Sequence, residues 1–108
     1  SGTLRGWYVV FKADTYELWS RCDEDEINFT AERYRAVSLP RGVTIEAPLP
    51  PNILFQPINK DVVFLSNAQT ESYPFTSLSD HVTISLKSTF SSDVFKVGVR
   101  KTGDIYEK

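Results

Sequence analysis

Residues 81–87 read His-Val-Thr-Ile-Ser-Leu-Lys, and apolar and polar side chains alternate along the whole stretch. Residues 94–100 repeat the alternation, with Phe95 on the apolar side. A period of two is typical of a half-buried β-strand, so the two stretches predict strands that turn one side toward a core. Gly103 follows in a predicted tight turn, where glycine accommodates positive φ. We therefore expect the C-terminal third to form an antiparallel sheet.

The N-terminal part of the chain predicts a second hairpin. Residues 7–12 are apolar on both sides of a strand, with Trp7, Val9 and Phe11 on one side. A strand with two apolar sides is expected to be covered on each of them. After a short turn, residues 16–22 are predicted to pair back along it.

The middle of the chain predicts short elements. One helical turn is expected at 28–32, and residues 66–80 are rich in turn formers and are expected to form a surface loop. Short strands are predicted at 33–39, 43–47, 53–56 and 62–65. About eight short strands separated by turns indicate a mainly β fold, an antiparallel sandwich-like domain with two small sheets and little helix.

The length of 108 residues predicts one domain over residues 1–108. The first two residues, Ser-Gly, are a pair that tag removal often leaves, so we expect residues 1–5 to be disordered or foreign to the natural protein. The longest apolar run, at 7–11, has five residues, whereas a membrane span needs about 20. With one cysteine, Cys22, the chain cannot form an internal disulfide.

Candidate catalytic residues are few, and we expect no enzymatic activity and no cofactor. The single histidine, His81, stands beside Asp80 at the start of a predicted strand, which favours a solvated strand end over a catalytic pair. Cys22 precedes a run of carboxylates, which raise the pKa of a thiol and so disfavour a nucleophilic role. A half-buried structural cysteine is the favoured interpretation.

The acidic run at residues 23–26 has two interpretations. Asp23 and Asp25 are weak candidates for calcium ligands, because hard cations bind several carboxylate oxygens on a flexible loop. The glycine and the distant glutamate of an EF-hand loop are missing. A plain solvated loop without a metal is therefore the favoured interpretation.

The chain is slightly acidic overall, so its net charge does not favour binding to nucleic acid. The net charge is −2 and the sequence pI is about 5.3, so no overall positive field attracts nucleic acid. Locally, Lys96, Arg100 and Lys101 could contact DNA or another partner through phosphate groups. Cations that guard a sheet edge against aggregation predict the same residues, and we favour that alternative.

The order of several short motifs resembles a known family. The motifs are Tyr8-Val9-Val10-Phe11, Leu39-Pro40-Arg41-Gly42-Val43-Thr44-Ile45, Phe55-Gln56-Pro57, Val82-Thr83-Ile84-Ser85 and Lys101-Thr102-Gly103-Asp104-Ile105. Over residues 7–108 this progression is similar to the globular heads of type IV pilin-like proteins. The match is to minor pilins and the H-type minor pseudopilins of type II secretion. Its most specific piece is 39–45, and it departs from the family at Asn59, where a glycine is usual.

The resemblance implies a structural role in assembly. Family members carry a long N-terminal helix, absent here, that anchors them in the bacterial inner membrane and packs into a pilus or pseudopilus. The head lies in the periplasm or on the cell surface. The expected partners are therefore other pilins or pseudopilins and the inner membrane, both through that helix, with DNA a weaker candidate.

The same resemblance implies that Trp7, Val9 and Phe11 pack on the missing helix or on another subunit. We then expect an exposed apolar strip near the first strands, which a second copy would cover in a crystal. The alternative function is a non-catalytic extracytoplasmic β-sandwich that binds a protein, DNA or carbohydrate partner. In that alternative, Tyr73 and Phe75 of the 66–80 loop would hold the partner.

Overall fold

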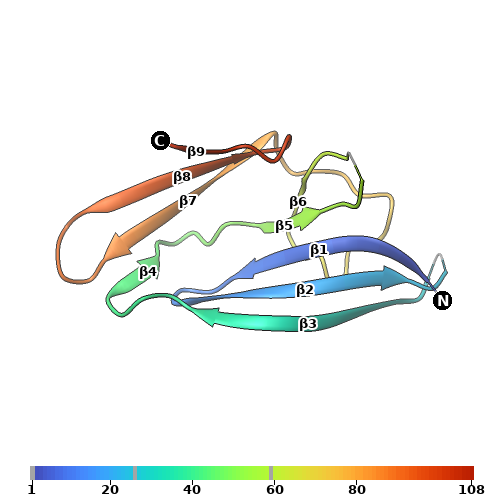
Figure 1. Cartoon of the computed structure of the whole chain (residues 1–108). Helices are drawn as coiled ribbons and strands as arrows, with labels where there is room; N and C mark the ends of the chain where they lie inside the picture. The colour runs from blue at the N-terminus through green and yellow to red at the C-terminus, as the bar shows by residue number, and fades with distance from the viewer. Residues whose placement is uncertain (1, 26, 59) are drawn as a thin grey trace.

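The computed structural model describes residues 2–25, 27–58 and 60–108, and this part of the chain forms nine β-strands (Figure 1). The strands are β1 Thr3–Phe11, β2 Thr15–Asp23, β3 Phe29–Ser38, β4 Val43–Ile45, β5 Asn52–Phe55, β6 Val63–Leu65, β7 His81–Ser88, β8 Val94–Arg100 and β9 Ile105–Glu107. No helix long and apolar enough to cross a bilayer occurs within the described ranges. The expectations for Ser1, Glu26 and Asn59 lie outside these ranges.

The first sheet, which we call sheet A, has five antiparallel strands in the order β3-β2-β1-β5-β6. Strand β1 lies in its centre, so that Val9 pairs with Leu18 of β2 on one side and with Ile53 of β5 on the other. The ladder between β1 and β2 shifts register between Leu4 and Gly6, and Gly6 takes a φ of 145°. A β-carbon there would overlap the backbone of Phe55, which explains the need for glycine.

The second sheet, which we call sheet B, has four antiparallel strands in the order β4-β7-β8-β9. The predicted hairpin of β7 and β8 is confirmed, and Leu86 pairs with Phe95 in it. Strand β9 then pairs with β8, with Ile105 opposite Val99. The mainly β fold with two antiparallel sheets and little helix, as the sequence predicts, is therefore confirmed.

One core lies between the two sheets. It consists of Ile53, Val62, Phe64, Val82 and Val99, with the half-buried Phe11 and Ile84 packed against it. Because Phe11 and Ile53 belong to sheet A and Val82 and Val99 to sheet B, these residues identify the sides that the sheets turn toward each other. We call them the inner sides. Full burial of one such aliphatic or aromatic side chain contributes about 2 kcal/mol.

A second core lies on the opposite side of sheet A, beneath the 66–80 loop. It contains Tyr8, Leu54, Val63, Leu65 and Ala68, with Val10, Trp19, Ala31 and Phe75 packed against it. The rings of Tyr8 and Trp19 stack at a centroid distance of 6.2 Å. The predicted loop has no strand, but it covers a sheet rather than lying free on the surface.

Three expectations from the sequence are wrong in detail. The helical turn expected at 28–32 is a strand, since β3 begins at Phe29 and pairs with Asp23, which gives its backbone a ladder partner. Of the two alternatives given for residues 1–5, disorder is wrong for residues 3–5, which open β1, where Thr3 pairs with Asp23; a foreign origin of residues 1–5 stays a prediction. Phe95 lies on the inner side as predicted but is 64% exposed, because the core between the sheets ends before it.

Candidate functional site

An exposed aromatic patch crosses the inner side of sheet A. Trp7 lies on the same side of β1 as Phe11, two alternations away. It pairs in register with Phe55 of β5, and its ring contacts Tyr34 of β3 edge-on at a centroid distance of 5.7 Å. Trp7 is 45% exposed, Phe55 41% and Tyr34 71%. We call these three residues the aromatic patch.

The inner side of sheet B is also partly uncovered. Phe95 and Val97 share the side of Val99, and Ile105 pairs with Val99 from the next strand. Phe95 is 64% exposed and Ile105 70% exposed. Together with Leu86 they line an open hollow of about 450 Å³. We call Leu86, Phe95, Val97 and Ile105 the bare face of sheet B.

The aromatic patch and the bare face both lie on inner sides of the sheets. The shared core joins the two sheets over only part of their length. Figure 1 shows the far end of the β7–β8 hairpin projecting away from the strands β1–β3. Apolar side chains on the inner sides of both sheets are thus left open to solvent beyond the shared core. Exposed apolar surface of this kind is typical of a site of contact with another molecule.

The structure separates the three residues expected to pack on a helix or on another subunit. Trp7 is exposed, Val9 is half-buried, and Phe11 packs against the core between the sheets. The opposite side of β1, with Tyr8 and Val10, is covered by the 66–80 loop. The two apolar sides of β1 are therefore covered as expected, by the 66–80 loop on one side and by the core between the sheets around Phe11 on the other, and Trp7 is left exposed.

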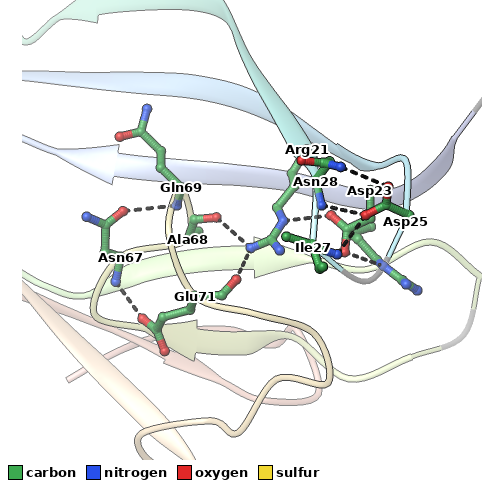
Figure 2. A network of polar contacts seen from close by, with 10 residues as sticks. Arg21, Asp23, Asp25, Ile27, Asn28, Asn67, Ala68, Gln69 and Glu71 are labelled. Carbon is green, nitrogen blue, oxygen red and sulfur yellow. Dashed lines mark hydrogen bonds and ion pairs between the residues drawn. The ribbon is translucent and has the colours of Figure 1, made fainter.

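A polar network fastens the 66–80 loop to sheet A (Figure 2). Arg21 is buried and donates from Nε to Oδ1 of Asp23 at 2.9 Å. Its Nη1 donates to the carbonyl oxygens of Ala68, at 3.1 Å, and of Glu71. Arg5 binds the other carboxylate oxygen of Asp23 at 3.0 Å. The network thus joins β1, β2 and the loop.

Aromatic rings complete this network. The guanidinium of Arg21 lies between the rings of Phe29 and Phe75, 3.9 and 4.9 Å from their centroids. Arg5 lies 3.5 Å from the centroid of Tyr73. Cation–π contacts of this kind are worth more where solvent is excluded. Tyr73 and Phe75, the expected ligand-binding residues of the loop, are therefore engaged in holding the loop itself.

The two weak calcium candidates, Asp23 and Asp25, line the same open hollow, but hydrogen bonds within the protein engage both carboxylates. Asp23 is buried in β2 and accepts hydrogen bonds from both arginines, so the expected solvated loop does not begin there. Asp25 accepts from the backbone N–H groups of Ile27 and Asn28, both at 2.7 Å. These bonds, that of Asn28 first, hold the pKa of Asp25 below its usual value. The described residues contain no cluster of three or more metal-ligating side chains.

The catalytic candidates stay apart in the structure. Cys22 is half-buried in β2, opposite Leu4 and Thr30. Asp80 faces Lys101, with 3.6 Å between the carboxylate and the ammonium group. No hydrogen bond in the described part of the chain joins Asp80 or Cys22 to the His81 side chain.

The basic candidates divide between two places. Lys101 lies in the turn after β8 beside Asp80, whereas Lys96 and Arg100 lie on the outer side of sheet B, opposite the core. Lys87 and Lys108 lie on the same outer side, and sequence reasoning missed them. The alternation of residues 81–87 places Lys87 on the outer side, so this cation could have been predicted from the sequence. Because β8 lies between β7 and β9, the edge-guard interpretation is wrong.

Comparison of the chain with protein-family models, with curated proteins and with solved structures finds no match.

Proposed function

We propose that this chain is the globular head of a membrane-anchored pilin-like protein, a minor pilin or minor pseudopilin, with a structural and non-catalytic role. In such a protein an apolar helix precedes the first strand and packs on the head, which is then carried into a filament. The observation that supports the proposal is the pair of uncovered apolar surfaces, the aromatic patch and the bare face of sheet B.

The position of these surfaces favours contact with other molecules. Both lie on inner sides of the sheets beyond the shared core, where an apolar helix or a neighbouring subunit could cover each of them. Aromatic side chains such as Trp7 and Phe55 bury large areas when they are covered, which favours assembly energetically. The order of the motifs along residues 7–108 supports the same family.

The test follows the natural full-length protein in the cells that make it. An antibody raised against this domain is expected to detect the protein in the inner membrane and, after shearing, in the filament or pseudopilus fraction. The double substitution W7S/Y34S is expected to reduce the assembled fraction at least severalfold, because it removes most of the aromatic patch. Ile27→Ser, at an exposed apolar residue in the β2–β3 turn, is the matched control and should assemble normally.

Thermal unfolding followed by circular dichroism establishes that each variant still folds. The proposal is rejected if the native protein is found only in fractions without membrane or filaments. It is also rejected if W7S/Y34S folds and assembles as well as the control. A free protein that binds a partner through the aromatic patch would instead support the binding-module alternative.

A further inference from the structure

We infer that two copies of this chain pair through the free edge of β3, in antiparallel orientation, and join their A sheets into one continuous sheet with five strands from each copy. This inference goes beyond the proposed function and does not depend on it. Strand β3 is the longest of the nine described strands and forms one margin of sheet A. Within the described part of the chain, no backbone group of residues 29–38 is hydrogen-bonded outside the ladder with β2. A long unpaired strand edge is a template for a further strand.

The other margins of the two sheets are short or covered. At β6, the backbone N–H of Phe64 donates to the Ser77 hydroxyl at 3.0 Å, and the Phe64 carbonyl accepts from the N–H of Leu78. Strands β4 and β9, at the margins of sheet B, have three residues each. Figure 1 shows β3 along the lower margin of the molecule, with the hairpin of β7 and β8 at the opposite margin. Strand β3 therefore offers the longest open edge in the described ranges.

The backbone of β3 directs alternate residues toward this free edge. Its two ends are bonded toward β2, because the Asn28 carbonyl accepts from the N–H of Glu24 and the Leu39 N–H donates to the carbonyl of Asp14. The direction alternates along an antiparallel strand, except at Tyr34, which is an extra residue without a partner in β2. The residues whose backbone groups point outward are therefore 29, 31, 33, 36 and 38.

A two-fold axis at Arg33 places the outward-directed residues of two copies opposite one another. Residue 29 then meets residue 38 of the second copy, residue 31 meets residue 36, and Arg33 meets its own counterpart. Each outward position thus finds an outward partner, which is the arrangement of the hydrogen-bonded pairs in an antiparallel ladder. An axis at another outward residue would leave one end of the strand unpaired. The backbone of β3 is therefore self-complementary over its length.

The charges of β3 favour a second copy over an unrelated strand. The ladder with β2 places both Glu32 and Arg35 on the inner side of sheet A, because Tyr34 is an extra residue between them. With the axis at Arg33, Glu32 of each copy lies directly opposite Arg35 of the other, which gives two cross-strand pairs of opposite charge. Both side chains are exposed, and the ion pairs of the described residues involve neither of them.

The residues beside the axis are compatible with this pairing. The two copies of Arg33 meet on the side of the sheet opposite Glu32, and each forms an ion pair with Glu17 of its own chain at 3.7 Å, which offsets their repulsion. Tyr34 is 71% exposed and contacts Trp7 on the inner side. Pairing brings two such rings to the same side of the joined sheet, where their mutual burial adds apolar contact.

The test reverses the charges one at a time. Sedimentation equilibrium of the 108-residue protein between about 5 and about 500 μM is expected to show a reversible dimer. E32R and R35E each place like charges opposite one another at two positions, so each should raise the dissociation constant of the dimer about tenfold or more. Mixed in equal amounts, the two variants should form a heterodimer of nearly the original affinity, because each reversed charge then faces an opposite one.

K96E is the matched control, since it makes the same change of charge as R35E on an exposed residue of sheet B, and it should dimerise normally. Ala36→Pro gives an independent result, because the Ala36 N–H points to the free edge and its loss removes no bond of the β2–β3 ladder. Circular dichroism should show that this variant folds, and its dimer should be about tenfold weaker or more.

Three outcomes would overturn the inference. The first is an unmodified protein that stays monomeric over the whole concentration range. The second is dimerisation of E32R and R35E as strong as that of K96E, because the copies would then meet through another surface. The third is a mixture of E32R and R35E that associates no better than either variant alone, since the two charges would then not face each other across the interface.

Discussion

Arg21 donates its Nε hydrogen bond to Oδ1 of Asp23 over 2.9 Å, and both side chains lie on the side of sheet A that the 66–80 loop covers. Burying this ion pair costs desolvation free energy, so the pair is stable only because other groups also hydrogen-bond to it. Arg5 supplies one for Asp23, and the Ala68 and Glu71 carbonyls supply two for Arg21. The pair therefore fixes the loop to the sheet rather than stabilising β2 alone.

Arg21→Met is expected to destabilise the domain by about 3 kcal/mol, because Asp23 loses a buried partner and two loop carbonyls lose their donor. Urea unfolding measures the loss, and hydrogen exchange should show faster opening within residues 66–80. Arg33→Met is the control, since Arg33 is exposed and its ion pair with Glu17 spans 3.7 Å. It should cost less than about 1 kcal/mol. Equal losses in the two variants would refute the role given to Arg21.

Because Tyr8 is buried, we expect the free energy of unfolding to fall above pH 10. Burial raises the pKa of Tyr8 to about 12, against a smaller opposing effect of the nearby Gln69 side chain, and the buried hydroxyl makes no hydrogen bond of good geometry with the described residues. Below the ordinary tyrosine pKa of about 10 both folded and unfolded chains are protonated, so stability is unaffected. As the pH rises from 10 toward 12, the unfolded chain loses its proton first and stability falls, by roughly 2 kcal/mol.

The measurement is urea unfolding between pH 8 and pH 11.5, compared with Tyr8→Phe. The variant should be at least as stable as the natural chain at pH 8, since it removes a buried hydroxyl without a partner. It should also lose less stability above pH 10. Parallel curves for the two proteins would show that Tyr8 titrates normally.

Gly6→Ala is expected to destabilise the domain by more than about 1 kcal/mol. The φ of 145° is unfavourable for alanine, and the new β-carbon would overlap the Phe55 carbonyl group across the β1–β5 ladder. Gly103→Ala is the comparison, because that position also has positive φ but faces open space, with its first neighbour at 3.9 Å. Thermal unfolding should therefore place Gly6→Ala below Gly103→Ala, and the reverse order would contradict the close approach of β5.

The sequence predicts the strands that alternate and misses interactions that depend on distant residues. The alternation of apolar and polar residues in 81–87 and 94–100 predicts two paired strands, and the structure confirms the pairing. Residues 28–32 have no strong pattern, and β3 starts there because β2 offers a ladder. Local sequence cannot show that Phe95 extends past the shared core, since this depends on where sheet A ends.

The same limit applies to the candidate site. Arg21 and Asp23 appear solvated in the sequence, because their neighbours are charged, yet the loop that buries them follows about 45 residues later. Trp7 was found from the apolar pattern of β1, whereas Tyr34 and Phe55 join it only through sheet pairing and ring contact. Lys108 joins the outer cations through a contact with Thr83, far away in the chain.

The central place of β1 has a mechanical consequence. Its hydrogen bonds to β2 and β5 run across the strand, so a force pulling on its N-terminal end would load both ladders in shear, many bonds at once. A force on β9, three residues long at the margin of its sheet, would peel its bonds away one after another. Under a force along the strands, a tether at the start of the chain therefore loads many more ladder hydrogen bonds than one at its end.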